Sequence, residues 1–171
     1  MGKKIATVIT DLFEDVEYTD PAEAFKKEGH EVTTIEKESG KTVKGKAEQT
    51  PVTIDKGIDE VNAKDFDALF IPGGFSPDQL RADERFVKFA TEFLQANKPI
   101  FAICHGPQLL IQTGQLKGRT VTGFTSILLD LKNAGANVKD EEAVVDDNIV
   151  TSRNPDDIPA FIKESLKQLE K

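Results

Sequence analysis

The chain of 171 residues has one cysteine, two histidines and no tryptophan. A lone cysteine, Cys104, cannot form an internal disulfide bond, and with two histidines it matches no common zinc site, so we expect no metal. The first ten residues lack the long apolar run and small-residue cleavage site of a secretory signal. We therefore expect a cytoplasmic protein that folds without disulfide bonds.

Long hydrophobic runs and clustered basic residues are also missing. No apolar stretch approaches the ~20 residues of a membrane-spanning helix, which excludes a membrane role. The formal charge of -8 disfavours stable nucleic-acid binding, because phosphate contacts need concentrated Lys and Arg. The segment 40–46 begins like a phosphate-binding loop, but Ala47 stands where a metal-binding hydroxyl is needed, so we interpret 41–46 as a solvated loop.

Strand-like and helix-like segments alternate along the chain. Predicted strands are 5–10, 32–35, 68–71 and 99–103; predicted helices are 86–94, 108–111, 126–133 and 158–169; predicted hairpins lie within 40–55 and 143–151. This order predicts one domain, 1–171, with an α/β fold: a three-layer α/β/α sandwich around a mainly parallel, flavodoxin-like sheet with a small β-hairpin excursion. A further helix is expected to begin at Asp20, with Pro21 in its first turn, and to end at Gly29.

In parallel sheets, binding sites lie beyond the carboxyl ends of the strands. Three loops, 11–18, 72–78 and 104–107, follow predicted strands at that edge. Cys104 stands where the buried strand 99–103 turns abruptly into a helix, a position that projects a nucleophile above the sheet. Unpaired amides at the following helix N-terminus favour the thiolate, so we interpret Cys104 as reactive rather than as a small core residue.

Candidate partners of the sulfur come from the same three loops. His105 could act as general base or acid, although adjacent residues at such a turn point in different directions. Gly74, in Pro72-Gly73-Gly74, and the amide of His105 could form a two-donor oxyanion hole. Glu14, like its acidic neighbours in 11–17, follows the first strand. A carboxyl group assists a thiolate only when it is protonated and donates a hydrogen bond to sulfur.

At these residues the sequence resembles the PfpI-like intracellular peptidase and deglycase family. This family belongs to the superfamily of class I glutamine amidotransferases and the Parkinsonism-associated deglycase. The motifs that carry the resemblance span nearly the whole chain: Phe13-Glu14-Asp15-Val16-Glu17, Phe66-Asp67-Ala68-Leu69, Pro72-Gly73-Gly74, Ala102-Ile103-Cys104-His105-Gly106-Pro107-Gln108, Asn133-Ala134-Gly135 and Thr151-Ser152-Arg153. The likeness is greatest to the bacterial stress-protective deglycase branch.

The resemblance implies that Cys104 is the nucleophile, His105 its catalytic neighbour and Glu14 the carboxyl group that hydrogen-bonds the sulfur. Asp78 stands where the peptidase branch has an acid that reaches the histidine from an adjacent subunit, which implies a homo-oligomer, a dimer or hexamer. Aspartate is shorter than the glutamate of that branch. Amidotransferases need a histidine far downstream of the cysteine, and this chain has none after His105. Glutamine hydrolysis is therefore disfavoured.

The implied function is a cofactor-free cysteine hydrolase that removes methylglyoxal or glyoxal adducts from amines and thiols, with small-molecule aldehydes as further substrates. Two alternatives remain open. One is an intracellular cysteine peptidase, which requires a peptide groove or an enclosing assembly. The other is a redox-sensing stress protein or chaperone whose Cys104 is oxidised instead of turning over.

Overall fold

The computed structural model describes residues 2–171. Its strands are β1 (Lys4–Val8), β2 (Glu31–Glu36), β3 (Thr42–Lys44), β4 (Pro51–Thr53), β5 (Lys56–Gly57), β6 (Ala68–Ile71), β7 (Ile100–Ile103), β8 (Thr120–Val121), β9 (Asn137–Val138), β10 (Val144–Asp146) and β11 (Ile149–Ser152). Its α-helices are α1 (Asp15–Lys27), α2 (Ser76–Leu80), α3 (Glu84–Gln95), α4 (Pro107–Gln112), α5 (Leu128–Asn133) and α6 (Ile158–Leu169).

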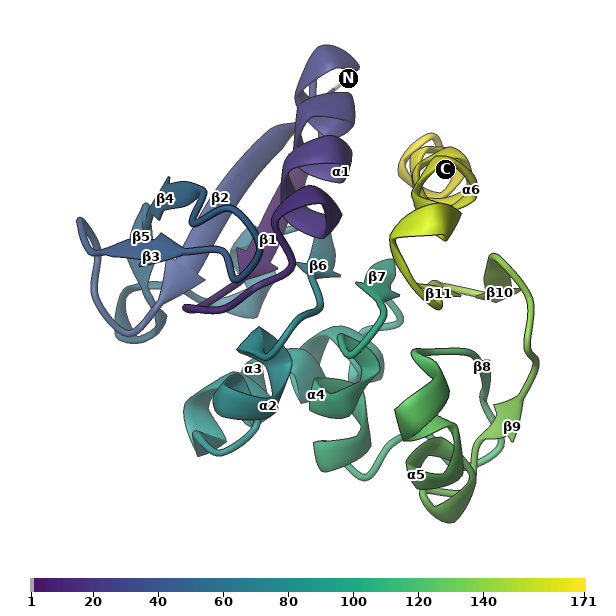
Figure 1. Cartoon of the computed structure of the whole chain (residues 1–171). Coiled ribbons are helices and arrows are strands. Elements are labelled where there is room, and N and C mark those ends of the chain that lie inside the picture. Colours follow the sequence, from purple (N-terminus) through teal and green to yellow (C-terminus); the bar gives the residue numbers. More distant parts are fainter. Residues whose placement is uncertain (1) are drawn as a thin grey trace.

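A seven-stranded sheet in the order β10-β11-β7-β6-β1-β2-β5 forms the centre of the molecule (Figure 1). Only β10 runs antiparallel to its neighbour; the other pairs in this sheet are parallel. Strands β3 and β4 form a separate antiparallel hairpin. The predicted mainly parallel sheet, its terminal hairpin and the β-excursion are therefore confirmed.

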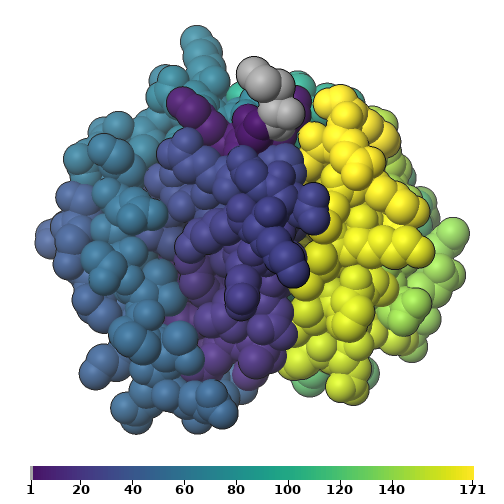
Figure 2. Space-filling view, turned by 90° about the horizontal axis from the view of Figure 1, so that it is seen from above, coloured from purple at the N-terminus to yellow at the C-terminus, as the bar shows by residue number. Residues whose placement is uncertain are grey.

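Helices cover both faces of the sheet. Within β6, Ala68 and Phe70 pack on the side of α1 and α6, whereas Leu69 and Ile71 pack on the side of α3, α4 and α5. This alternation of buried side chains is what a strand covered on both faces requires. Figure 2 shows α1, in dark purple, lying beside the yellow C-terminal helix α6. The three-layer sandwich predicted from the sequence is confirmed.

The predicted start of the first helix is wrong. Helix α1 begins at Asp15, and Pro21 lies inside it instead of in its first turn. Tyr18, Ala22 and Phe25 are buried at helical spacing, so the apolar face continues N-terminal to the proline and its packing offsets the hydrogen bond that Pro21 cannot donate. Because the helix starts earlier, Asp15 and Glu17 lie in its first turn, and the helix determines the direction in which each side chain points.

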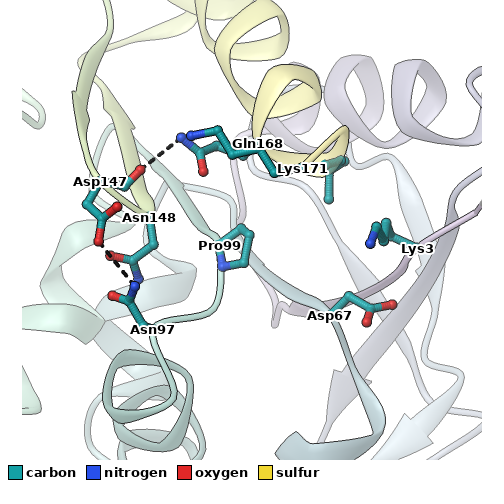
Figure 3. Close-up of a pocket in the computed structure, with 9 residues that line it drawn as sticks. Lys3, Asp67, Asn97, Pro99, Asp147, Asn148, Gln168 and Lys171 are labelled. Atoms are coloured by element: carbon teal, nitrogen blue, oxygen red, sulfur yellow. Dashed lines mark hydrogen bonds between the residues drawn. The ribbon is translucent and has the colours of Figure 1, made fainter.

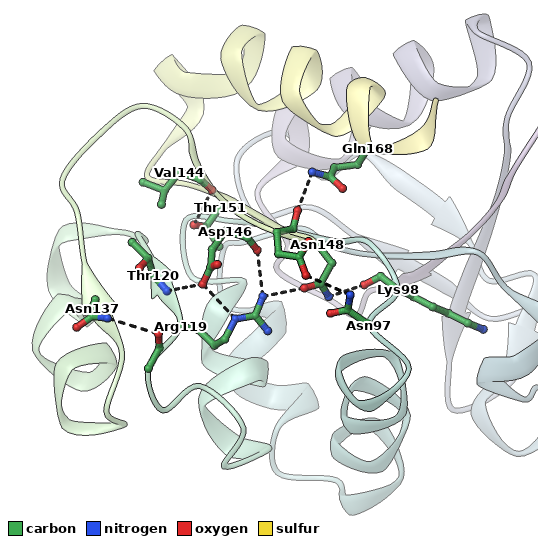
Figure 4. A network of polar contacts seen from close by, with 12 residues as sticks. Asn97, Lys98, Arg119, Thr120, Asn137, Val144, Asp146, Asn148, Thr151 and Gln168 are labelled. Atoms are coloured by element: carbon green, nitrogen blue, oxygen red, sulfur yellow. Dashed lines mark hydrogen bonds and ion pairs between the residues drawn. The ribbon is translucent and has the colours of Figure 1, made fainter. Parts of the chain in front are cut away.

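A network of polar side chains and a cavity lie at the amino ends of the strands. Arg119 donates to the side chains of Asp146 and Asn148, and so ties β8 to the β10–β11 turn (Figure 4). A cavity of about 280 Å³ opens nearby, with residues that directly precede strands, such as Asp67 and Pro99, in its wall (Figure 3). It lies at the opposite edge of the sheet from Cys104. Within residues 2–171, we find no helix with the length and apolarity needed to cross a membrane.

Candidate active site

Cys104 lies between β7 and α4 with φ at +63°, a left-handed conformation that residues other than glycine rarely adopt. Its N–H donates to the Ser152 carbonyl at 2.9 Å, and its carbonyl accepts from the Phe124 N–H at 2.8 Å. Behind it, a Cβ added at Gly106 would lie 2.5 Å from the Ile71 carbonyl oxygen, so only glycine fits there. The sharp turn therefore presents Cys104, which is 6% exposed, at the carboxyl edge of the sheet.

The carboxyl group beside the sulfur belongs to Glu17, in the first turn of α1. Glu17 is fully buried, and its nearest polar neighbours are the Cys104 thiol and the Gly73 amide. Neither of its carboxyl oxygens forms a hydrogen bond of standard geometry with another atom of residues 2–171. Burial, followed by repulsion from Glu14, raises the pKa of Glu17 to about 8. A carboxyl group with such a pKa is mostly protonated at neutral pH.

The sequence prediction that Glu14 faces the sulfur is corrected by this geometry. Glu14 is the residue before α1, and its carboxylate pairs with the Lys46 ammonium at 2.8 Å. The expected helix start at Asp20 left both acids in a loop, so the sequence did not define which of them faces the sulfur. Once the helix begins at Asp15, Glu17 lies one residue before the buried Tyr18 and faces the interior.

The pKa of the Cys104 thiol is raised, first by burial and then by the negative charge of Glu17. The backbone amides of Gly74 and His105 act in the opposite direction. The sequence predicted that the N-terminus of the following helix would favour the thiolate. Helix α4 has only six residues and begins at Pro107, and its effect on the thiol pKa is outweighed by burial. Two adjacent buried acids cannot both ionise at low cost, so Cys104 and Glu17 titrate as a coupled pair.

His105 lies beside the sulfur. Its Nδ1 is 3.3 Å from Cys104 Sγ and its Nε2 is 3.3 Å from Ser126 Oγ. The ring stacks on Phe124 with centroids 4.8 Å apart. Burial, and then the positive charge of Lys46, lower the pKa of His105, so the imidazole is neutral at pH 7. A neutral ring can accept a proton at one nitrogen and donate from the other.

Asp78 does not orient His105 within one chain. Its carboxylate pairs with Arg81 at 3.1 Å, and its side chain is 60% exposed. Its negative charge nevertheless acts on His105 and opposes the lowering of the histidine pKa. The polar partner of the ring in this chain is Ser126. The other histidine, His30, accepts from the Lys3 amide at the opposite edge of the sheet.

The amides of Gly74 and His105 both point toward the sulfur. Gly74 has φ at +78°, and it pairs with Phe13 through an isolated antiparallel bridge. A Cβ at Gly74 would lie 2.5 Å from the Leu12 carbonyl oxygen, so the approach of these two segments needs glycine. Donors converging on one point next to a nucleophile are the arrangement that stabilises an oxyanion.

Besides Glu17, the sequence analysis missed two further residues of the site. Ser126 follows Phe124 and Thr125, and no local pattern indicates that its hydroxyl meets His105. Lys46 belongs to the segment that was interpreted as a solvated loop, yet its ammonium pairs with Glu14 and lies 5.8 Å from the centre of the Phe75 ring. Both contacts depend on tertiary structure, so spacing along the chain carries no signal for them.

The fold and this cysteine turn define a class of protein, and the chain belongs to the DJ-1/PfpI family, whose model matches residues 3–168. General stress protein 18 of Bacillus subtilis is 66% identical over 172 residues, covering 100% of both chains. Protein/nucleic acid deglycase 2 of Escherichia coli is 59% identical over 170 residues, covering 99% of both. The solved ThiJ/PfpI domain protein of Brachyspira murdochii superposes with a TM-score of 0.92 at 27% identity, covering 99% of this chain and 97% of that one.

Proposed function

We propose that this protein is a cysteine-dependent hydrolase that removes early methylglyoxal and glyoxal adducts from amines and thiols. The observation that carries the proposal is the Cys104 thiol, held in a left-handed turn between the buried Glu17 carboxyl group and two converging amides. The relative named as a protein/nucleic acid deglycase supports this class of substrate, which includes protein side chains and nucleobase amines.

At neutral pH both Cys104 and Glu17 carry a proton, and loss of one of them leaves a single proton shared by the pair. When the proton resides on Glu17, the carboxyl group is neutral and donates to a thiolate instead of repelling it. Because burial raises the pKa of both groups, this singly protonated, reactive form becomes more populated as the pH rises toward 8. The amides of Gly74 and His105 then stabilise negative charge on the sulfur or on a substrate oxygen.

For a methylglyoxal adduct, the thiolate attacks the carbinol carbon, an S–C bond forms, and the C–N or C–S bond to the carrier breaks. The carrier leaves with one proton. His105 then moves a proton from the attacked carbon to its neighbour, while the hydroxyl proton of the attacked carbon passes to the ketone oxygen, so that the attacked carbon becomes the carbonyl carbon of a lactoyl thioester. Water cleaves the thioester, so adduct plus water yields carrier plus lactate. One carbon is oxidised while its neighbour is reduced, and no external oxidant or cofactor is consumed.

The test follows lactate from the methylglyoxal adduct of N-acetylcysteine. Wild-type protein is expected to release lactate, and Cys104→Ala to release none above the uncatalysed rate. Activity that survives Cys104→Ala refutes the proposal. Peptide cleavage that persists through repurification and disappears in Cys104→Ser would replace it with the peptidase alternative. Oxidation of Cys104 by mild peroxide without any turnover would replace it with the redox sensor.

We further propose that the active form is a homo-oligomer in which Asp78 of one subunit reaches His105 of the next. The exposure of Asp78 at the rim and the electrostatic effect of its carboxylate on His105 support this proposal. An assembly of this kind would add a carboxylate partner to His105, whose ring nitrogens contact Cys104 and Ser126 within one chain.

A further inference from the structure

Lys46 reaches the site from the β3–β4 hairpin, far from Cys104 in sequence. Its N–H donates to the Phe13 carbonyl at 2.9 Å, and Phe13 in turn pairs with Gly74 beside the sulfur. The Lys46 backbone therefore lies across Phe13 from the glycine whose amide points at Cys104. Its side chain is 35% exposed, with the ammonium on Glu14 and near the Phe75 ring.

The loop that carries Lys46 is held by a dedicated buried carboxylate. Asp15 is 3% exposed and accepts from the backbone amides of Ala47 at 2.8 Å and Thr50 at 3.0 Å. A Cβ at Gly45 would overlap the Asp15 carboxylate, so the loop approaches as closely as the backbone allows. The three acidic residues at the start of α1 therefore make different contacts. Glu14 pairs with the Lys46 ammonium, Asp15 binds the backbone of the loop that carries Lys46, and Glu17 faces the Cys104 sulfur.

The Lys46 charge acts on the reacting groups without touching the sulfur. It contributes to the lowered pKa of His105, and the hydrogen bond to Glu14, together with the charge of Glu14, raises the pKa of Lys46 itself, which therefore stays cationic. An ammonium that is partly exposed and acts on His105 is placed to contact a part of the substrate that extends beyond the reacting carbon. The exposed Phe75 ring next to it supplies an apolar contact for the same part.

Resting on the function proposed above, we propose that Lys46 determines specificity by binding an anionic group, a carboxylate or a phosphate, on the molecule that carries the adduct. Glu14 does not block this role. An ammonium has three donors, of which Glu14 uses one, and exposed ion pairs are weak enough for an incoming anion to share or displace them.

The experiment compares two alkylating probes of Cys104 that have nearly the same shape, the anion iodoacetate and the neutral iodoacetamide. Cys104 is the single cysteine of the chain, so the intact mass reports only its modification. The ratio of the two rates, iodoacetate over iodoacetamide, should fall about three- to tenfold in Lys46→Met and be restored in Lys46→Arg. Lys44→Ala is the matched control, since Lys44 is an exposed lysine of the same hairpin, and it should keep the wild-type ratio.

The possible outcomes separate the two proposals. A ratio that Lys46→Met leaves unchanged overturns the role of Lys46, whatever the protein hydrolyses. A ratio that falls equally in Lys44→Ala also overturns it, because the effect is then general charge attraction. If neither probe modifies Cys104, the proposed function itself fails.

A second set of substrates identifies the anion. Methylglyoxal adducts of N-acetylcysteine and of its amide differ only in the carboxylate, and adducts of guanosine and guanosine monophosphate differ only in the phosphate. In wild-type protein, kcat/KM should favour the anionic member of at least one pair by about three- to tenfold, mainly through KM, and Lys46→Met should abolish that preference. Equal kcat/KM within both pairs would contradict the proposal.

Discussion

The buried Glu17 carboxyl group makes the stability of this protein depend on pH in a defined direction. Its pKa is raised from 4.5 in the unfolded chain to about 8 in the folded one. Between these values the unfolded chain releases the proton while the folded protein keeps it, so the wild type loses stability as pH rises. At pH 7 the loss is about 3 kcal/mol, and above pH 8 it reaches a plateau of about 5 kcal/mol.

Glu17→Gln removes this titration and keeps the shape of the side chain. Burying the amide has a cost of its own, but that cost does not vary with pH. The stability of the variant relative to wild type should therefore rise by about 1.4 kcal/mol per pH unit between pH 5 and pH 8. Urea unfolding at pH 5, 6, 7, 8 and 9 measures the difference.

Glu14→Gln is the matched control, because it neutralises a carboxylate three residues away that pairs with Lys46 at the surface. Its effect should stay within about 1 kcal/mol. A Glu17→Gln difference that is flat across this range, or that falls as pH rises, would refute the assignment of a protonated carboxyl group to Glu17.

Three further substitutions test the geometry. Gly73→Ala places a methyl group against the Glu17 carboxyl group and 2.7 Å from the Cys104 Cβ, so lactate release should fall about 100-fold. Gly114→Ala, at an open position with φ at +71°, should lower stability but keep wild-type activity, and equal losses of activity in the two variants would contradict this geometry. Ser126→Ala removes one hydrogen bond to His105 and should lower kcat about fivefold without changing the melting temperature; an unchanged kcat would exclude Ser126. Asp78→Asn should lower the activity of the oligomer, and a fully active monomer in sedimentation and assay would exclude an intersubunit role.

The sequence predicted those parts of the fold that local pattern determines. Helix α6 has the predicted bounds, and the predicted helix 86–94 lies within α3. The turn at Cys104 was predictable because a buried strand, a cysteine and small residues follow one another directly. In contrast, Pro21 indicated a helix start, but the apolar face before it governs where α1 begins.

The site was predicted less completely than the fold, because its contacts join distant segments. The choice between Glu14 and Glu17 depends on helix phase, and one turn of error in the start of α1 is enough to select the wrong acid. Lys46 approaches the site only because the amides after it bind the buried Asp15 carboxylate. No spacing within the chain encodes that contact, so a residue of the site was interpreted as part of a solvated loop.

The most direct test of the mechanism is to let the protein react with the methylglyoxal adduct of N-acetylcysteine for about one turnover, to quench the reaction with acid, and to measure the mass of the intact protein by mass spectrometry. We expect a transient lactoyl group on Cys104, located by peptide mapping, absent in Cys104→Ser, and released by hydroxylamine, which distinguishes the thioester from the hemithioacetal of the same mass. Lactate that accumulates while Cys104 never carries an acyl group, at any time sampled, would contradict the mechanism.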